Sequence, residues 1–231
     1  GTRQATAYPV CVVIYDLGSP LPSPLEDTDW SAMTRWAGPG NSWNQDSLGT
    51  VFGLTLDKFG NIFVTHASCY SPDAIGQVAG GAAGAVYRID ANTATITTFC
   101  VLPNLPDGSV AIPNENYPGL GNISYDCRND QFFVTNLEDG RIYRIKANGV
   151  NGTTGTVLET FDPLAPDTGM AGWAPGGERL WGVQVHGDRV YYAVWSETAV
   201  QPSATLVNEI PSVGLLAGGP FRTSAGRDRH E

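Results

Sequence analysis

Short runs of apolar residues, broken by glycine, asparagine and aspartate, recur along the middle of the chain. β-Branched and aromatic residues dominate these runs and often alternate with polar residues, as in residues 84–89 and 140–145. Such alternation is typical of half-buried β-strands, and no stretch of a dozen residues shows the 3.6-residue apolar period of an amphipathic helix. The pattern therefore predicts an all-β fold with tight turns.

The runs also repeat in a fixed order. The first copy comprises residues 52–57, 60–65, 84–89 and 94–101, the second comprises 121–126, 131–135, 140–145 and 155–161, and a third begins with 180–186 and 189–194. Asp57, Asp126 and His186 fall at equivalent places in the three copies. A sheet of four short strands cannot bury both of its faces alone, whereas several such sheets packed around an axis cover one another. The repeat therefore predicts a β-propeller with four-stranded blades, three of which are recognisable.

The expected organisation is a single propeller domain over residues 1–231. Its parts are a closing strand at 9–16, blades at 48–101, 117–161 and 179–216, and a polar tail at 217–231. The strand at 9–16 has no repeat around it, and the third copy lacks a clear fourth strand, so we expect these two pieces to complete one another. Three blades do not close a ring. Two chains could join to make six blades, the chain could be part of a longer propeller, or long loops could hide further strands; we favour assembly or truncation.

The repeat motifs resemble those of a known family. Residues 53–57 and 60–65 look like an NHL-type propeller repeat, and residues 140–145 resemble its third strand. More loosely, residues 48–215 are similar to the gluconolactonase and senescence-marker group and to propeller domains of secreted bacterial proteins. Members of these groups commonly have six blades. The resemblance is specific for architecture and not for activity.

The same resemblance implies a place for a metal ion. In the gluconolactonase-like proteins a divalent ion is held at the mouth of the propeller axis by carboxylate and amide oxygens, the ligands that hard cations prefer. Asn122, together with Glu115 or Glu178, could be carried over to that role for calcium or another divalent ion. A full ligand set is not visible. The function implied by this ion is a metal-dependent lactonase or hydrolase.

Six tryptophans fall in or beside the long loops. They are Trp30, Trp36, Trp43, Trp173, Trp181 and Trp195. The strand order of a propeller blade places all of these positions on one face, which we call upper, and the tight turns on the other. The tryptophans therefore predict either a binding platform for sugar rings or a protein partner, or a set of anchors that pin the long loops onto the blades.

Charge narrows the choice of partners. The 231 residues include 13 Lys plus Arg against 23 Asp plus Glu, a formal net charge of −10. Nucleic acids and anionic membranes select cationic surfaces, so neither is an expected partner. No apolar run approaches the roughly 20 residues of a membrane-spanning helix. We expect self-association instead, with glycans as an alternative.

Cysteines and glycosylation sequons favour an extracellular protein. The four cysteines match no metal or haem motif, and an even count fits disulfides in an oxidising compartment. Cys69 with Cys100 is the favoured pair, which leaves Cys11 with Cys127. Asn122 and Asn151 each begin an Asn-X-Ser/Thr sequon, which marks an acceptor for N-glycosylation in a secreted protein. Four unpaired buried cysteines are the alternative.

Motifs for catalysis are missing from the sequence. His66 and His186 have no serine, cysteine or aspartate partner at motif spacing, and residues 26–29 lack the spacing of a calcium loop. The sequence therefore favours binding over catalysis. We expect a secreted binding or assembly module, an extracellular structural or surface protein that could be a filament or oligomer subunit, with no required cofactor. A lactonase-like enzyme and a carbohydrate-binding lectin are the alternatives.

Overall fold

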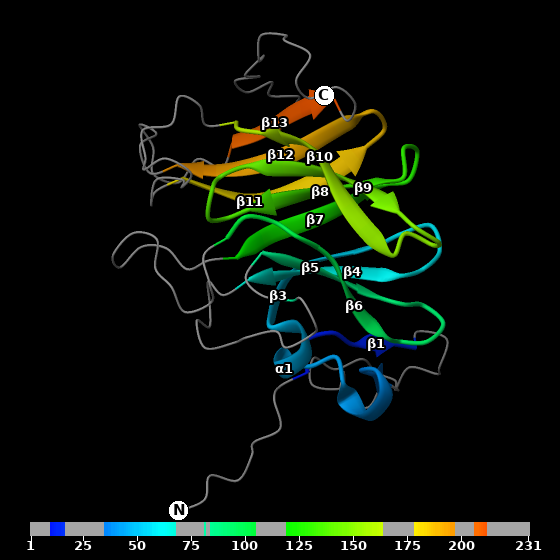
Figure 1. Cartoon of the computed structure of the whole chain (residues 1–231). Helices are drawn as coiled ribbons and strands as arrows, with labels where there is room; N and C mark the ends of the chain where they lie inside the picture. The colour runs from blue at the N-terminus through cyan, green and yellow to red at the C-terminus, as the bar shows by residue number, and fades with distance from the viewer. Residues whose placement is uncertain are drawn as a thin grey trace, which may run out of the picture.

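A computed structural model describes most of the repeated region of the chain. The described residues are 10–16, 35–67, 81, 84–104, 119–163, 178–196 and 206–211, and within 178–179, 194–196 and 206–211 only the backbone is described. Figure 1 shows three β-sheets stacked in sequence order, with a short helix and a small strand pair below the first sheet.

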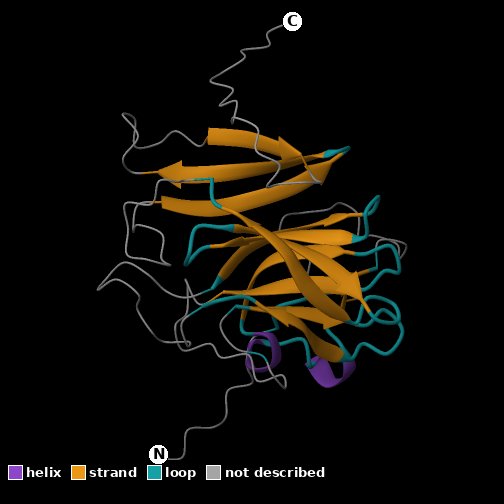
Figure 2. Ribbon diagram, turned by 45° about the horizontal axis from the view of Figure 1, so that its top comes forward, coloured by secondary structure: helices purple, strands orange, loops and turns teal. Residues whose placement is uncertain are grey.

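Each of the three sheets is antiparallel and is built from consecutive strands (Figure 2). The first sheet contains β3 (Thr50–Leu56), β4 (Ile62–Ala67), β5 (Ala85–Ile89) and β6 (Ile96–Val101). The second contains β7 (Leu120–Asp126), β8 (Gln131–Asn136), β9 (Ile142–Asn148) and β10 (Thr154–Phe161). The third contains, in the described residues, β11 (Glu178–His186), β12 (Arg189–Ser196) and β13 (Leu206–Pro211).

The sheets pack face to face, with their first strands side by side. β7 contacts both β3 and β11, and these three strands form the inner edge of the stack. Between the first two sheets Phe63 and Phe99 pack on Phe132. Between the second and third sheets Phe133 packs with Val183, Val190 and Tyr192. Consecutive up-and-down sheets that bury both faces in this way are the blades of a β-propeller, so the fold-class prediction is confirmed, with three blades.

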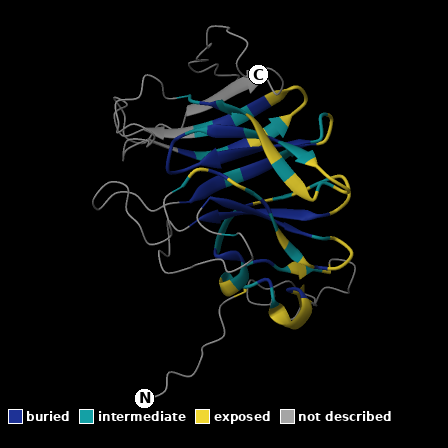
Figure 3. Cartoon of the chain, viewed as in Figure 1, coloured by how far each residue is buried: buried dark blue, intermediate teal, exposed yellow. Residues whose placement is uncertain are grey.

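An N-terminal segment covers the free face of the first blade. β1 (Ile14–Tyr15) pairs with β2 (Arg35–Trp36), and a 3₁₀ turn at Pro39–Asn41 and α1 (Gln45–Leu48) follow. α1 begins after Asn44, whose Oδ1 accepts a hydrogen bond from the Ser47 amide. Val12, Trp43 and Leu48 pack on the outward residues of β4 and β5, among them Val64 and Tyr87. Every residue of β4 and β5 is buried, as the dark blue strands of the first sheet in Figure 3 indicate.

This segment corrects one expectation. Residues 9–16 were predicted to close the last blade, yet residues 14–15 pair with residues 35–36 beside the first blade. The cause is apolar packing: Val12 lies 3% exposed in the same cluster as Trp43 and Leu48. The expected pairing with the third blade is therefore wrong.

The turns at the other end of the blades bear out the repeat. Asp57 accepts hydrogen bonds from the amides of Phe59 and Asn61, at 2.8 and 2.9 Å. Asp126 does the same for Arg128 and Asn129, at 3.1 and 3.3 Å. Both carboxylates thus close the turn that follows an inner strand, as short polar side chains do in Asx turns. His186 takes the equivalent place at the end of β11.

Several segments lie outside the described residues. They are 1–9, 17–34, 68–80, 82–83, 105–118, 164–177, 197–205 and 212–231, the last of which contains the predicted polar tail. Of these, 105–118 and 164–177 join consecutive blades. Among the described helices, none has the length and hydropathy needed to cross a membrane.

Candidate functional site

All three inner strands carry the same irregularity. The register with the neighbouring strand shifts between Val51 and Leu54 in β3, between Leu120 and Ile123 in β7, and between Leu180 and Val183 in β11. Each shift is a β-bulge, in which two residues of the inner strand face one residue of its partner. The bulged pairs are Phe52 with Gly53, Gly121 with Asn122, and Trp181 with Gly182. The three blades can therefore be compared position by position.

A threonine faces the bulge in the first two blades. Thr65 Oγ1 accepts a hydrogen bond from the Gly53 amide at 2.7 Å and donates to the Gly121 carbonyl oxygen at 2.6 Å. Thr135 Oγ1 accepts from the Asn122 amide at 2.9 Å and lies 3.5 Å from the Trp181 carbonyl oxygen. One hydroxyl thus satisfies the bulge of its own blade and bonds the inner strand of the next blade.

Glycine at the bulge allows the inner strands to approach closely. A Cβ atom on Gly53 would lie 2.7 Å from the Ile123 nitrogen and 2.8 Å from Asn122 Cα, both backbone atoms of the next blade. A Cβ atom on Gly121 would lie 2.9 Å from the Leu180 carbonyl oxygen. Since these contacts are shorter than any real Cβ contact, glycine is required at both positions.

The third blade departs from this arrangement. The register places Ala193 where the first two blades have Thr65 and Thr135, so no hydroxyl faces the bulge at Gly182. A Cβ atom on Gly182 would meet only the Ala193 Cβ atom, at 3.7 Å. The glycine is present, but among the described residues no following inner strand approaches it.

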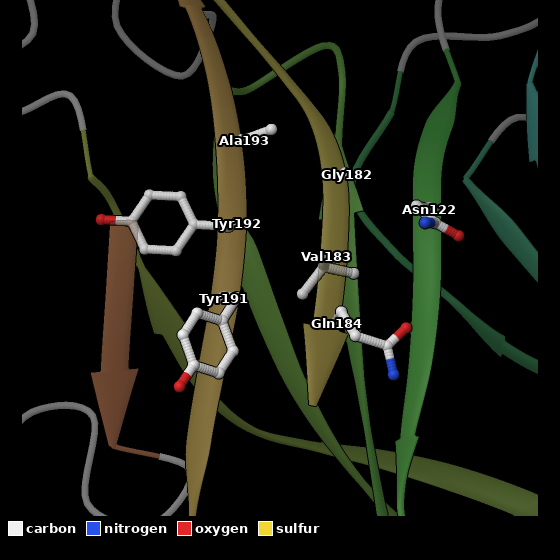
Figure 4. Close-up of a pocket in the computed structure, with 7 residues that line it drawn as sticks. All are labelled: Asn122, Gly182, Val183, Gln184, Tyr191, Tyr192 and Ala193. Carbon is white, nitrogen blue, oxygen red and sulfur yellow. The ribbon is translucent and has the colours of Figure 1, made fainter. Parts of the chain in front are cut away.

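An open hollow lies at this place on the third blade. It has a volume of about 250 Å³ and is lined by Asn122, Gly182, Val183, Gln184, Tyr191, Tyr192 and Ala193. Figure 4 shows the hollow with Gly182, Val183 and Gln184 on β11, both tyrosines and Ala193 on β12, and Asn122 on the neighbouring strand β7. Val183 and Tyr192 pack against the second blade, so the residues that alternate with them face away from it. We call Gly182, Gln184, Tyr191 and Ala193 the end face.

The end face is polar but carries no charge. Gln184 Nε2 donates to the Val185 carbonyl oxygen at 3.1 Å, and its side chain is exposed. Beneath the face, burial raises the pKa of Tyr192 to about 12, so that phenol stays protonated at neutral pH. The hollow therefore offers amide and phenol groups for hydrogen bonding and no charged group for catalysis.

The opposite end of the stack exposes apolar side chains. Leu54 and Leu56 on β3 are 47% and 54% exposed. The register makes Leu54 the counterpart of Ile123 and Val183, which are 3% and 2% exposed against the preceding blade. The N-terminal segment covers β4 and β5 but leaves these two side chains exposed. We call Leu54 and Leu56 the leucine pair.

A buried polar cluster joins the first blade to the second at the β8–β9 turn. Asn104 Nδ2 donates to Asn136 Oδ1 at 3.2 Å, and the Gly119 amide donates to Asn104 Oδ1 at 2.6 Å. Asp139 accepts hydrogen bonds from the Arg141 amide, at 3.0 Å, and from the Tyr143 hydroxyl. Burial raises the pKa of Asp139 to about 6. Because both oxygens of this carboxyl group are engaged, the cluster reads as structural.

The three tryptophans whose side chains are described, Trp36, Trp43 and Trp181, do not form one platform. Trp43 is 1% exposed in the cover of the first blade, and its Nε1 donates to the Ala94 carbonyl oxygen in the β5–β6 turn, at 3.2 Å. The Trp43 ring contacts the Trp36 ring edge to face. The ring centroids of Trp181 and Phe52 lie 5.6 Å apart. Trp43 is thus an anchor and is wrong as a ligand-binding residue. Trp30, Trp173 and the side chain of Trp195 lie outside the described residues.

The implied metal site lacks support from the described residues. Asn122 Oδ1 accepts a hydrogen bond from the Ile123 amide at 2.8 Å, and no carboxylate lines the hollow beside it. The side chains of Glu115 and Glu178 lie outside the described residues. In the part of the chain that is described, no group of three or more His, Cys, Asp or Glu is placed to hold an ion. The calcium site stays a prediction, and we derive no chemistry through it.

The predicted disulfides are not formed. Cys100 and Cys127 carry free thiols, and the Cys11 thiol donates to the Gly49 carbonyl oxygen at 3.3 Å. The pairing of Cys11 with Cys127 is wrong, because Cys11 lies against the start of β3 while Cys127 lies in the exposed β7–β8 turn. Cys69 lies outside the described residues, and its predicted partner Cys100 is unpaired. Burial raises the pKa of Cys100 to about 12, so this thiol stays protonated at neutral pH.

The remaining candidates are placed as follows. Asn151 is exposed in the β9–β10 turn, whereas the sequon at Asn122 lies inside β7, with Ser124 3% exposed. His66 is fully buried against Gly49, and His186 is exposed at the end of β11.

The end face and the leucine pair were not predicted from the sequence. The signal for the end face was available, since alignment of the repeats places alanine at 193 opposite threonine at 65 and 135.

Comparisons with known proteins add no family. No protein-family model and no curated protein matches the sequence. Among solved structures, a PQQ-bound aldose sugar dehydrogenase from Streptomyces coelicolor is 15% identical, with 77% of this chain and 50% of that chain covered and a TM-score of 0.48. A nidogen/laminin complex is 14% identical, with 70% and 44% covered and a TM-score of 0.40. YCF48 from Cyanidioschyzon merolae is 12% identical, with the same coverage and TM-score. The chain thus spans half or less of these β-propeller structures, and its own fold assignment rests on its sheet order and blade packing.

Proposed function

We propose that this chain is a β-propeller binding module that acts by assembly, as a subunit of an oligomer or filament at an extracellular surface or matrix. The observation that carries the proposal is the exposure of the leucine pair. Leu54 is 47% exposed while its counterparts Ile123 and Val183 are 3% and 2% exposed. An inner strand that is buried in two blades is thus uncovered in the first.

Apolar burial contributes to association at this surface. Covering what remains exposed of two leucine side chains contributes about 2 kcal/mol. This alone does not offset the loss of translational and rotational freedom on binding, so the contacts around the pair must supply the rest. The pair lies on regular secondary structure, since β3 pairs with β4 along its length.

The extracellular location is supported by the sequon at Asn151, which lies in an exposed turn. Passage of the chain through a glycosylating secretory pathway should attach one N-glycan, which Asn151→Gln removes. Retention of the glycan in that variant would place it at Asn122 and contradict the burial of this sequon in β7.

The assembly proposal is tested by sedimentation velocity of the full chain over a wide concentration range. Wild-type protein should associate reversibly, and Leu54→Thr/Leu56→Thr should remain monomeric, because threonine keeps the β-propensity of the strand and removes the apolar surface. Val157→Thr/Leu158→Thr is the matched control, since these residues are 39% and 46% exposed on β10, an outer strand. A wild-type chain that stays monomeric at every concentration would overturn the proposal.

A further inference from the structure

The leucine pair and the end face are the two ends of one stack of blades. We infer that they bind each other in different copies of the chain, so that the end face of one copy covers the leucine pair of a second copy, head to tail. The inference rests on the proposed assembly function and names its partner and its surfaces.

The contacts inside the chain provide the template for this interface. Ile123, the counterpart of Leu54, is buried against the face of the first blade that carries Phe63 and Thr65. In the third blade the register puts Tyr191 and Ala193 at the places of Phe63 and Thr65. If the packing of one blade on the next is repeated between two copies, the end face is the surface that covers Leu54. The leucine pair and the end face lie on opposite sides of the second blade, and we assign the covering surface to a second copy of the chain.

Gly182 is compatible with such a contact. Gly53 occupies the same place in the first bulge, where backbone atoms of the following inner strand would lie within 2.8 Å of a Cβ atom. Asn122 occupies it in the second bulge, so a following inner strand does not require glycine here. The third blade has the glycine of the first bulge, and among the described residues only Ala193 lies near it.

The two surfaces are also compatible in charge. The chain carries a formal net charge of −10, so two copies repel each other at long range. The leucine pair and the four end-face residues are uncharged, and Arg189, on the same face of β12 two positions before Tyr191, would border the contact. Because Val12, Trp43 and Leu48 already cover β4 and β5, the contact is confined to the inner strand β3 of the receiving copy.

Ala193 makes this contact weaker than those inside the chain. By the pattern of Thr65 and Thr135, a hydroxyl at position 193 would accept from the Gly182 amide and donate to the Phe52 carbonyl oxygen of the second copy. A head-to-tail interface therefore predicts that Ala193→Thr tightens association. A gain of this kind is not expected from a residue that lies outside the interface.

The experiment measures the dissociation constant of full-length chains by sedimentation equilibrium. Gly182→Ala should weaken association if the contact has the geometry of the first bulge, because its methyl group has space in the monomer and would meet backbone atoms of the incoming strand as a Cβ atom on Gly53 would. Ala193→Thr should tighten association about fivefold, the effect of one added hydrogen bond. Urea unfolding of each variant under monomeric conditions shows whether the fold itself has changed. Gly182→Ala should leave the unfolding midpoint in place.

Each outcome decides the inference. A closed dimer and an open chain of copies both support it, since head-to-tail contacts form rings or filaments according to the rotation between copies. Wild-type association that Leu54→Thr/Leu56→Thr abolishes, but that Gly182→Ala and Ala193→Thr leave unchanged, would overturn the inference and keep the proposed function. A wild-type monomer at all concentrations would overturn both.

Discussion

The hydroxyl of Thr65 donates a 2.6 Å hydrogen bond to the carbonyl oxygen of Gly121, 56 residues further along the chain. Thr65 Oγ1 also accepts a hydrogen bond from the Gly53 amide at 2.7 Å, so one buried side chain satisfies a bulge in its own blade and bonds the next blade. The stack is therefore held by specific polar contacts at its inner edge as well as by the apolar layers between its sheets.

Thr65→Val should measure how much this contact contributes to the free energy of unfolding. The substitution keeps the shape of the side chain but leaves the Gly53 amide and the Gly121 carbonyl oxygen without this partner in a buried place. We expect the free energy of unfolding to fall by about 1–3 kcal/mol, measured by urea denaturation. Thr97→Val is the control, because Thr97 lies exposed on β6 with one long hydrogen bond of 3.4 Å. Equal losses in the two variants would show that the bridge contributes nothing of its own.

The repeat made the blades predictable from the sequence. Turn residues such as Asp57 and Asp126 mark the ends of inner strands, and apolar alternation marks the strands between them. The bulges were not predictable from alternation alone, since two adjacent residues facing one partner break the period of two that identifies a strand. They become visible only when the three copies are compared in register.

The N-terminal cover could not be predicted in the same way. Residues 9–16 and 35–48 have no counterpart elsewhere in the chain, so no repeat indicates what they contact. The sequence left open whether Trp43 binds a ligand or anchors a loop, and its position is decided by the uncovered face of the first blade. Tertiary packing of this kind has no local signal in the sequence.

Trp43→Phe tests the role of the N-terminal cover. The indole nitrogen donates to the Ala94 carbonyl oxygen at 3.2 Å, and the ring is 1% exposed. Phenylalanine removes the donor and part of the buried ring, so we expect a loss of about 2 kcal/mol in the free energy of unfolding. Trp36→Phe should cost much less, since Trp36 is 46% exposed. A binding role for Trp43 without a structural one would leave the unfolding midpoint unchanged.

Asp126→Ala tests the turn that follows the second inner strand. The carboxylate is 2% exposed and accepts from the amides of Arg128 and Asn129 and from the Gln131 side chain, the last at 2.8 Å. Removing it leaves the buried Gln131 amide without this acceptor, so we expect a destabilisation of about 2–4 kcal/mol. Asp188→Ala, in the exposed turn of the third blade, should stay within about 0.5 kcal/mol of wild type. Urea denaturation of both variants makes the comparison, and similar midpoints would contradict it.

Asp139 should make stability depend on pH in the opposite sense to most carboxylates. Burial raises the pKa of Asp139 to about 6, above the value of about 3.9 in an unfolded chain. The folded state thus favours the protonated acid, whose contribution is complete below about pH 4 and is lost as the pH rises through 6. A shift of this size corresponds to at most about 3 kcal/mol.

In Asp139→Asn the amide cannot ionise, so the variant should gain stability relative to wild type between pH 4.5 and pH 7.5. Urea denaturation at both pH values isolates this residue, because all other groups titrate in both proteins. A constant difference between wild type and variant would show that Asp139 is ionised throughout, held by Arg141 and the hydroxyl of Tyr143.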